Sequence, residues 1–359
     1  MRAKSQYMSV QLADPETAAL LGARAGETIR LALAPADVTI VEEIDTYLAG
    51  FAPFEFRADA ACPVVLVDRD SYQFRTFGSN NAFRRVNVEA GNQTGINEVD
   101  PESSLGTYRV IERALGSYIS AVVEENATAL YQPRLAAARR IRWALDLDRE
   151  VRFWTLLTTL GNWAVANRTT LLAGFQWGGP AGVGANSDPI TDIQTRIEAS
   201  AQPVSGIWMN PQVGHAFLRH PLVRDHMRQM LGDSAPQPGL VASAGQNQAG
   251  VDFVLPGLPP IKIAPAKQLN EVTNALDYVL NDTVVLVTHP VMGAPTSGQE
   301  INTCTTFRRR GTSGTGYQSR EYFVNERGLE GGTMLVAGHA EDIQIVANNC
   351  GGGIFDVIQ

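Results

Sequence analysis

The residue types that most often do chemistry are present in this chain, but their spacing matches no catalytic or metal-binding pattern. His215, His220 and His226 are five and six residues apart in turn, so no two share the i, i+4 helix face of helical zinc motifs. The cysteines Cys62, Cys304 and Cys350 form no Cys-x-x-Cys pair. We therefore expect no metal site and no cofactor, and we expect each cysteine to be a small buried hydrophobic residue.

Motifs for phosphate binding and covalent catalysis are also absent from the sequence. It has no G-x-x-x-x-G-K-[ST] loop, no G-x-G-x-x-G after a strand and no G-x-S-x-G elbow. The segment RRRGTSGTG at Arg308–Gly316 is the nearest approach to an anion site, but no helix start follows it. We interpret it as a hairpin loop between strands, and the glycine clusters at 178–184 and 351–353 as loops. A catalytic site is not visible.

Composition narrows the class of protein. The chain has 359 residues, of which 44% are hydrophobic and 18% charged, with a formal net charge of −8. These values exclude disorder, and the length allows two domains or one large discontinuous domain. The longest apolar runs, such as Val64–Val67, are strand-sized, so we expect no membrane span, and Met1–Gln11 has no export-signal pattern.

Arginine dominates the basic residues, because 26 of the 29 are arginines. The planar guanidinium forms bidentate ion pairs and is weakly hydrated, which suits ion pairs closed inside protein–protein contacts. A GC-rich genome would enrich arginine, alanine and glycine without any such role, so both explanations stay open.

The first 120 residues predict an arm followed by a long hairpin. Residues 1–60 are acidic and interrupted by prolines, with helical spacing only over Thr39–Phe51, and a strand is expected at Pro63–Val67. Two segments of period 2, Ser71–Val88 and Thr107–Ile119, then flank a polar stretch that contains glycine. Aromatic residues alternate with arginines on both segments. Such a surface needs cover, either from its own domain or from a neighbouring subunit.

A long helix is the strongest local prediction. Ala127–Ala166 carries an apolar stripe at helical spacing, and Pro133 marks a possible first turn. From Arg134 to Arg152 it has six arginines against three acidic residues, so it is locally basic in an acidic protein. That face is either a solvated surface or a face toward the phosphates of nucleic acid.

The second half predicts an α+β layout after a glycine-rich connector at 174–188. We expect helices over Pro189–Ala201, capped by Asp188, and over Pro211–Leu231, with a short strand at Gly206–Met209 between them. A low-complexity loop spans 232–250. Further strands are expected at Ile261–Ala264 and Thr283–Thr288, and from Thr303 to Val346.

In this order the elements resemble the major capsid protein of tailed bacteriophages, whose Hong Kong ninety-seven type fold is shared with encapsulins. The phrases TYRVIERALGSYISAVVEENA at Thr107–Ala127, LDLDREVRFW at Leu145–Trp154 and IWMNPQVGHAFLRHPLVRDHM at Ile207–Met227 are similar to segments of this family. The resemblance implies an N-terminal arm at 1–60, a peripheral domain at 61–187 and an axial domain at 188–346. It places the extended loop (E-loop) at 71–119 and the spine helix at 127–166, with a return to the peripheral domain near 300–359.

The resemblance also implies function and partners. We expect a non-enzymatic coat protein that self-assembles as pentamers and hexamers into an icosahedral shell around double-stranded DNA. The expected partners are a separate scaffolding protein, since few residues precede the E-loop, a portal and a cement or decoration protein. The expected location is the virion capsid, assembled in the bacterial cytoplasm. No lysine lies between Lys4 and Lys262, so the lysine–asparagine cross-link of some members is not available to this E-loop.

Site residues follow from the same comparison. We expect inter-subunit contacts from charged E-loop residues, namely Arg75, Arg84, Arg85, Glu89, Glu98, Asp100 and Glu102. The candidates for facing packaged DNA are Arg139, Arg140 and Arg142, and those for the loop at the capsomer centre are Asp233, Pro236, Pro238 and Gln246. An encapsulin-type compartment is the nearest alternative function, and an α+β metabolic enzyme is less favoured.

Overall fold

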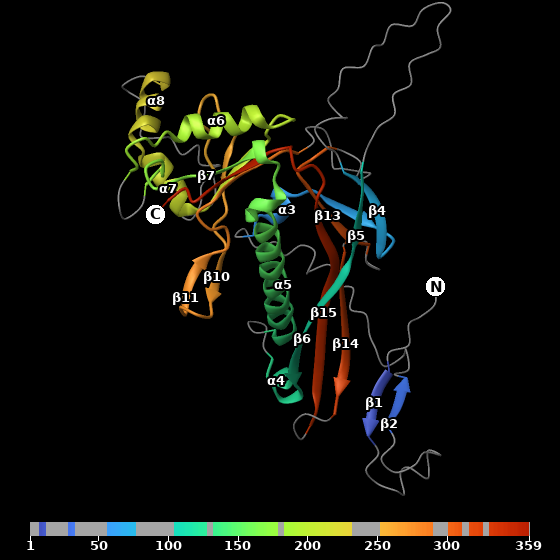
Figure 1. Cartoon of the computed structure of the whole chain (residues 1–359). Coiled ribbons are helices and arrows are strands. Elements are labelled where there is room, and N and C mark those ends of the chain that lie inside the picture. The colour runs from blue at the N-terminus through green and yellow to red at the C-terminus, as the bar shows by residue number, and fades with distance from the viewer. Residues whose placement is uncertain are drawn as a thin grey trace, which may run out of the picture.

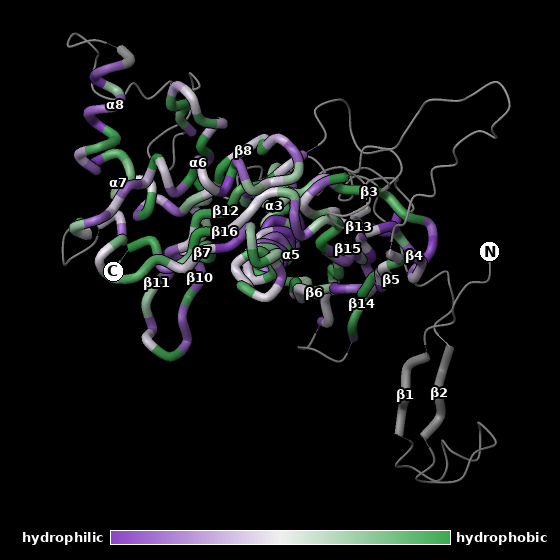
Figure 2. The backbone as a smooth tube through the Cα atoms, turned by 45° about the horizontal axis from the view of Figure 1, so that its top comes forward, coloured by the Kyte–Doolittle hydropathy of each residue, from purple (hydrophilic) through white to green (hydrophobic). Residues whose placement is uncertain are grey.

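The computed structural model describes residues 7–11, 28–32, 56–76, 104–127, 132–178, 183–231, 252–289, 301–310, 316–325 and 330–358. Two mixed sheets lie on either side of one long helix, α5 (Pro133–Thr158), with three shorter helices beyond the first sheet (Figure 1). Figure 2, turned by 45°, shows the same order of layers, with α5 between the sheets. The layers are helix, sheet, helix, sheet.

The first sheet is buried on both faces. Its strand order is β7 (Arg168–Thr170), β16 (Gly352–Phe355), β12 (Val284–Val287), β8 (Gly206–Met209) and β9 (Ile261–Ile263). Val284 and Leu286 face one hydrophobic core, whereas Val285 and Val287 face another. Two-sided burial explains why β12 is a continuous apolar run without polar alternation.

Helices α6 (Pro189–Ala199), α7 (Pro211–Arg219) and α8 (Pro221–Leu231) cover one face of this sheet. Asp188 caps α6 as predicted, since its carboxylate accepts from the Thr191 amide at 3.2 Å. The single helix predicted over Pro211–Leu231 is wrong. The chain breaks at His220, which is extended, because Pro221 has no amide hydrogen and disfavours a helical residue before it.

The second sheet contains the predicted strands of the segment 303–346. Its order is β14 (Tyr317–Val324), β15 (Gly332–Ile345), β13 (Cys304–Arg309) and β3 (Val64–Val67), and β6 (Ile111–Ser120) also pairs with β15. β15 therefore holds the sheet together. β13 and β14 are separated by β15, so the hairpin loop predicted at Arg308–Gly316 is wrong: its first two arginines belong to β13, and 311–315 lie outside the described residues.

Helix α5 begins at Pro133 and is shorter than the predicted 127–166. Its 26 residues make a rod of about 39 Å. A separate turn, α4 (Ala121–Glu125), precedes it, and two 3-10 turns at 160–162 and 165–167 follow it. The side chains of Asn162 and Trp163 donate to the carbonyls of Leu156 and Leu157 at 2.7 Å each. These bonds satisfy carbonyls that the end of a helix leaves open, and so fix its length.

The predicted two-stranded hairpin is confirmed only in its first part. β4 (Ser71–Thr76) pairs antiparallel with β5 (Ser104–Arg109). The return strand then leaves its partner after Val110, whose amide donates to the Asp70 carbonyl at 2.8 Å, and continues as β6 in the second sheet. The extended segment predicted over Thr107–Ile119 is therefore confirmed with a break at Val110, but the prediction that all of it pairs in the hairpin is wrong. Residues 77–103 and the helix predicted at Thr39–Phe51 lie outside the described residues.

Several strands are not predicted from the sequence. They are β1 (Tyr7–Gln11) with β2 (Thr28–Ala32), β7, the hairpin of β10 (Lys267–Asn270) with β11 (Ala275–Tyr278), and β16. The cluster at 351–353, interpreted above as a loop, enters β16 instead. Gly351 has φ of +92°, and a Cβ there would lie 2.2 Å from the Leu286 carbonyl oxygen. Glycine is needed at this position so that β16 can approach β12.

We expect Asn210→Ala to lower the free energy of unfolding by about 2 kcal/mol, measured by urea denaturation. The buried Asn210 caps α7 by accepting from the Val213 amide at 2.7 Å, and it donates to the carbonyls of Leu280 and Asn281. Asn210→Asp is the matched variant, because it keeps the cap but loses both donated bonds. Equal stability of the alanine variant and the wild type would contradict this role.

Candidate functional site

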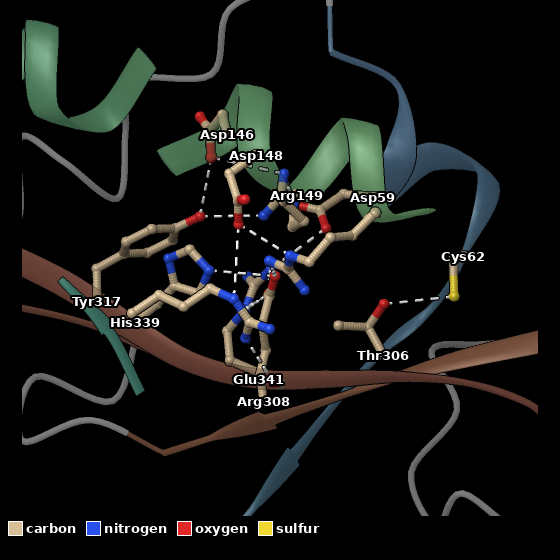
Figure 3. A network of polar contacts seen from close by, with 12 residues as sticks. Asp59, Cys62, Asp146, Asp148, Arg149, Thr306, Arg308, Tyr317, His339 and Glu341 are labelled. Atoms are coloured by element: carbon tan, nitrogen blue, oxygen red, sulfur yellow. Dashed lines mark hydrogen bonds and ion pairs between the residues drawn. The ribbon is translucent and has the colours of Figure 1, made fainter. Parts of the chain in front are cut away.

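A buried network of ion pairs joins α5 to the second sheet (Figure 3). Glu341 of β15 is at its centre, with 0% of its side chain exposed. Its carboxylate accepts from Arg308 of β13 at 2.9 Å and from Arg152 of α5 at 2.9 Å. His339 is two residues before Glu341 on β15 and so lies on the same face of the sheet, with its Nε2 3.1 Å from Oε1 of Glu341. One carboxylate therefore ties two strands to the helix.

A second buried carboxylate, that of Asp146, lies on α5 itself, six residues before Arg152. Asp146, which is 1% exposed, accepts from Arg142 at 2.6 Å and from the Tyr317 hydroxyl at 3.2 Å. Arg149 donates to the same hydroxyl at 3.0 Å and pairs with Asp59 at 3.1 Å. The Arg142 guanidinium also lies 3.7 Å from the centre of the Tyr317 ring, a cation–π contact. Tyr317 of β14 is thus contacted by Arg142 on the face of its ring and by Asp146 and Arg149 at its hydroxyl.

The electrostatics of the network favour a charged Glu341. Burial raises the pKa of Glu341, but His339 and the charges of Arg308 and Arg149 outweigh burial and hold that pKa well below its usual range. Burial lowers the pKa of His339, so its ring is neutral near pH 7. Charges removed from water are tolerated only when they are paired. Here the pairs of Glu341 join β15 to α5 through Arg152 and to β13 through Arg308.

Glu150 joins α5 to the residues next to Asp59. Its fully buried carboxylate accepts from the amides of Arg57 and Ala58 at 3.0 and 2.8 Å, and from Nε1 of Trp154 at 2.7 Å. Burial raises the pKa of Glu150 despite these donors. The carboxylate fixes the start of α3 (Ala58–Ala61), and the chain then enters β3 of the second sheet. Glu150 therefore joins α5 to the segment that leads into β3.

The structure corrects part of the interpretation of the basic helix. Arg139 and Arg140 are exposed. Arg142 is only 4% exposed and is paired with Asp146, so the prediction that it faces DNA is wrong. Arg149 is buried in the same way. The spacing of Arg142 and Arg149 relative to Asp146, i, i+4 and i, i+3, is the sequence signal that could have indicated internal pairing.

The β4–β5 ribbon shows which aromatic residues the chain covers by itself. Phe74 and Tyr108 are buried against Phe307 of β13. The centroid of the Phe307 ring lies 5.1 Å from that of Phe74 and 4.4 Å from that of Tyr108. In contrast, Tyr72 is 56% exposed and Leu105 is 63% exposed. Cover from its own domain is therefore confirmed for Phe74 and Tyr108, and cover of Tyr72 and Leu105 by a neighbouring subunit stays a prediction.

The predicted contact residues are placed only in part. Arg75 is exposed on β4. The other predicted contact residues and the predicted capsomer-centre residues lie outside the described residues: Arg84, Arg85, Glu89, Glu98, Asp100, Glu102, Asp233, Pro236, Pro238 and Gln246. These assignments stay predictions.

The cysteines are buried, as predicted. Burial raises the pKa of Cys304 well above its usual range and that of Cys350 to about 11. Neither thiol is therefore activated as a nucleophile. Within the described ranges, no cluster of three histidine, cysteine or acidic side chains is arranged to hold a metal ion. No helix in the described part of the chain has the length and apolar character needed to span a membrane.

Comparison with known proteins identifies the fold. A phage-related protein from Bordetella bronchiseptica RB50 superposes with a TM-score of 0.62 at 15% identity, covering 89% of this chain and 97% of that one. The SrpI encapsulin of Synechococcus elongatus PCC 7942 superposes with a TM-score of 0.52 at 11% identity, covering 91% and 96%. The chain thus has the fold shared by phage capsid proteins and encapsulin shells, as the sequence predicts.

A curated relative narrows the class. The chain is 24% identical over 182 residues to the major capsid protein of Pseudomonas phage JBD67. The match covers 50% of this chain and 57% of the relative, so it spans little more than half of that protein's length. No protein-family model matches the chain.

We expect Glu341→Gln to lower the free energy of unfolding by about 3 to 5 kcal/mol, measured by urea denaturation at pH 7, because it leaves buried arginines without a counter-charge. The matched control is Asp148→Asn. Asp148 also pairs with Arg152, but its side chain is 52% exposed, so its loss should cost less than about 1 kcal/mol. Equal effects of the two variants would contradict the buried network as a determinant of stability.

The same network predicts acid sensitivity. Glu341 has a depressed pKa in the folded state, so its contribution is complete above the unfolded value of about 4.3 and is lost as the pH falls through the folded value. His339 acts in the same direction below about pH 6.5, because the unfolded chain takes up its proton more readily. The stability gap between wild type and Glu341→Gln should narrow as the pH is lowered from 7 to 3.5. A constant gap over that range would rule out this assignment.

Proposed function

We propose that this chain is the major capsid protein of a tailed phage. It assembles as pentamers and hexamers into an icosahedral shell that encloses double-stranded DNA, and it acts as a structural protein rather than an enzyme. The observation that carries the proposal is the fold, which follows an encapsulin shell subunit over 91% of this chain. The similarity to the major capsid protein of Pseudomonas phage JBD67 supports a phage shell within that class.

The physical features of the chain support a shell role. Ion pairs join α5 to β15 and β15 to β13, and Arg149 of α5 donates a hydrogen bond to Tyr317 of β14. These contacts make a rigid frame, which a container needs if one contact geometry is to repeat many times. Exposed apolar side chains such as Tyr72 and Leu105 stand on the ribbon beside that frame. Extensions that overlap neighbours enlarge the buried area of each subunit, and many modest contacts then add up in a closed shell.

Interactions with DNA are expected to be weak and independent of sequence. The net charge of −8 disfavours broad contact with phosphates, while Arg139 and Arg140 are basic exposed positions on α5. A scaffolding protein, a portal and a cement or decoration protein are the partners that such a shell implies. Assembly in the bacterial cytoplasm and residence in the virion capsid belong to the same proposal.

An encapsulin-type compartment is the second candidate, favoured by the similarity to the SrpI encapsulin. The experiment that tests both is negative-stain electron microscopy of the purified chain, together with analysis of what its particles contain. Closed shells support the class. Nuclease-protected DNA in particles from phage-producing cells selects the capsid, whereas a packaged protein cargo selects the encapsulin. A chain that stays monomeric under all assembly conditions contradicts both.

Removing the E-loop tip, Glu89–Glu102, should leave the subunit folded but reduce the yield of shells or make them fragile. The expected reason is loss of area buried on neighbouring subunits. Circular dichroism and thermal unfolding report folding, and microscopy with sedimentation reports assembly. A variant in which the same residues are replaced by a Gly/Ser linker of equal length separates loop closure from tip contacts. Intact particles of wild-type yield and strength from both variants would contradict the assigned role.

A further inference from the structure

The hairpin of β10 and β11 presents an uncovered apolar face. Leu269 and Leu276 are directly opposite in the register, so they share one face, and they are 55% and 66% exposed. The other face is polar, with Gln268 opposite Asp277. At the tip, Val272 is 92% exposed. Figure 1 shows the hairpin projecting away from the first sheet.

The hairpin is held in one conformation. The Asn270 side-chain oxygen accepts from the amides of Val272 and Thr273 at 3.0 and 3.3 Å, which fixes the turn. At its base the Val279 amide donates to the Ala266 carbonyl at 2.9 Å, and Ala266 and Leu280 are buried. A two-stranded hairpin with a bare apolar face is marginal in water, so this rigid projection gains from a partner that covers it.

Further uncovered apolar side chains, here together called the β7-edge patch, flank β7, the opposite edge strand of the same sheet. Its members adjoin β7 in the chain and are exposed by 41 to 77%: Leu160, Val165, Leu172 and Phe175. The hairpin follows β9, which is the other edge strand. Four strand spacings of about 4.8 Å, roughly 19 Å in all, separate the two edges. The exposures show that neither surface is covered by its own chain.

The charges of the two surfaces are complementary. The hairpin carries two exposed acidic residues, Glu271 at the turn and Asp277 on β11. Its one basic residue, Lys267, lies at the base, with its ammonium 4.6 Å from the centre of the Tyr278 ring, so the excess of negative charge is at the tip. Arg168 is the one ionisable residue between 160 and 175. Arg196 of α6 lies against this edge, donating to the carbonyls of Ala166 and Arg168 at 2.6 and 3.3 Å. An acidic apolar tip thus matches a basic apolar edge.

We propose that the β10–β11 hairpin of one copy binds the β7-edge patch of a second copy. The two surfaces differ and lie on opposite edges, so the contact is head-to-tail, and head-to-tail contacts close into rings when the rotation between copies allows it. Such a contact generates the pentamers and hexamers of the proposed shell. The inference rests on the proposed shell function and names the partner and the two surfaces that it uses.

Disulfide trapping tests the contact. The double variant Val272→Cys with Leu172→Cys is assembled and treated with oxidised glutathione, which takes up the two electrons and two protons released when two thiols join. The native cysteines are buried, so the introduced thiols react selectively. A ladder of covalent multimers up to pentamer and hexamer size is expected on a non-reducing denaturing gel, and reduction should return it to monomer. Val272→Cys with Val165→Cys tests the same patch at a second position.

The controls separate this contact from the shell function. Each single variant should give no ladder, and neither should Val272→Cys with Val254→Cys, whose partner site is 58% exposed but outside the patch. Normal particles without a ladder from either patch pair overturn the contact and leave the shell function standing. Absence of particles from the unmodified chain overturns the shell function, and the contact with it.

Discussion

Charge burial under α5 is the constraint on which the rest of the structure depends. A guanidinium removed from water is tolerated only beside a counter-charge, and the partners of Arg142, Arg149 and Arg308 are Asp146, Asp59 and Glu341. The first of these pairs lies within α5 and the third lies within the sheet. Arg149 joins α5 to Asp59 of α3, and Arg152 joins it to Glu341 of β15, so these two pairs restrict the rotation and the height of α5 over the sheet. The network therefore fixes a position that apolar packing alone would leave degenerate.

That fixed helix unites the two halves of the fold. Toward its end, Phe153, Trp154 and Leu157 pack against Trp208 and Val285 of the first sheet. Earlier turns pack through Ala138 and Ile141 on β15 and β6 of the second sheet. Both sheets thus pack against the same helix, which sets their positions relative to each other. The ribbon of β4 and β5 and the hairpin of β10 and β11 project from this frame.

The charged run of α5 shows where sequence reasoning fails. Six arginines in one stretch predict a solvated or phosphate-facing surface, yet Arg142 and Arg149 are internal. Several acidic partners of these arginines come from distant parts of the chain, so the run alone does not reveal them. They are Asp59 for Arg149, Glu341 for Arg152 and, at 3.4 Å, Glu321 for Arg134. The return strand is a similar case. Period 2 continues from Thr107 to Ile119, but the strand changes its partner at Val110, and a one-chain pattern carries no information about which strand lies opposite.

The sequence by itself determined the order and the type of most elements. Local signals were enough for β8 and β12, for the Asp188 cap, for the existence of α5 within 127–166 and for the burial of the cysteines, because each depends on neighbouring residues or on an apolar pattern. The resemblance of that order to capsid proteins was also readable from the chain. Tertiary structure alone decided the internal use of the arginines, the exchange of β6 into the second sheet, and the entry of the 351–353 glycines into β16. The physical reason is that ion pairing and strand pairing are set by atoms brought together from far apart in the sequence.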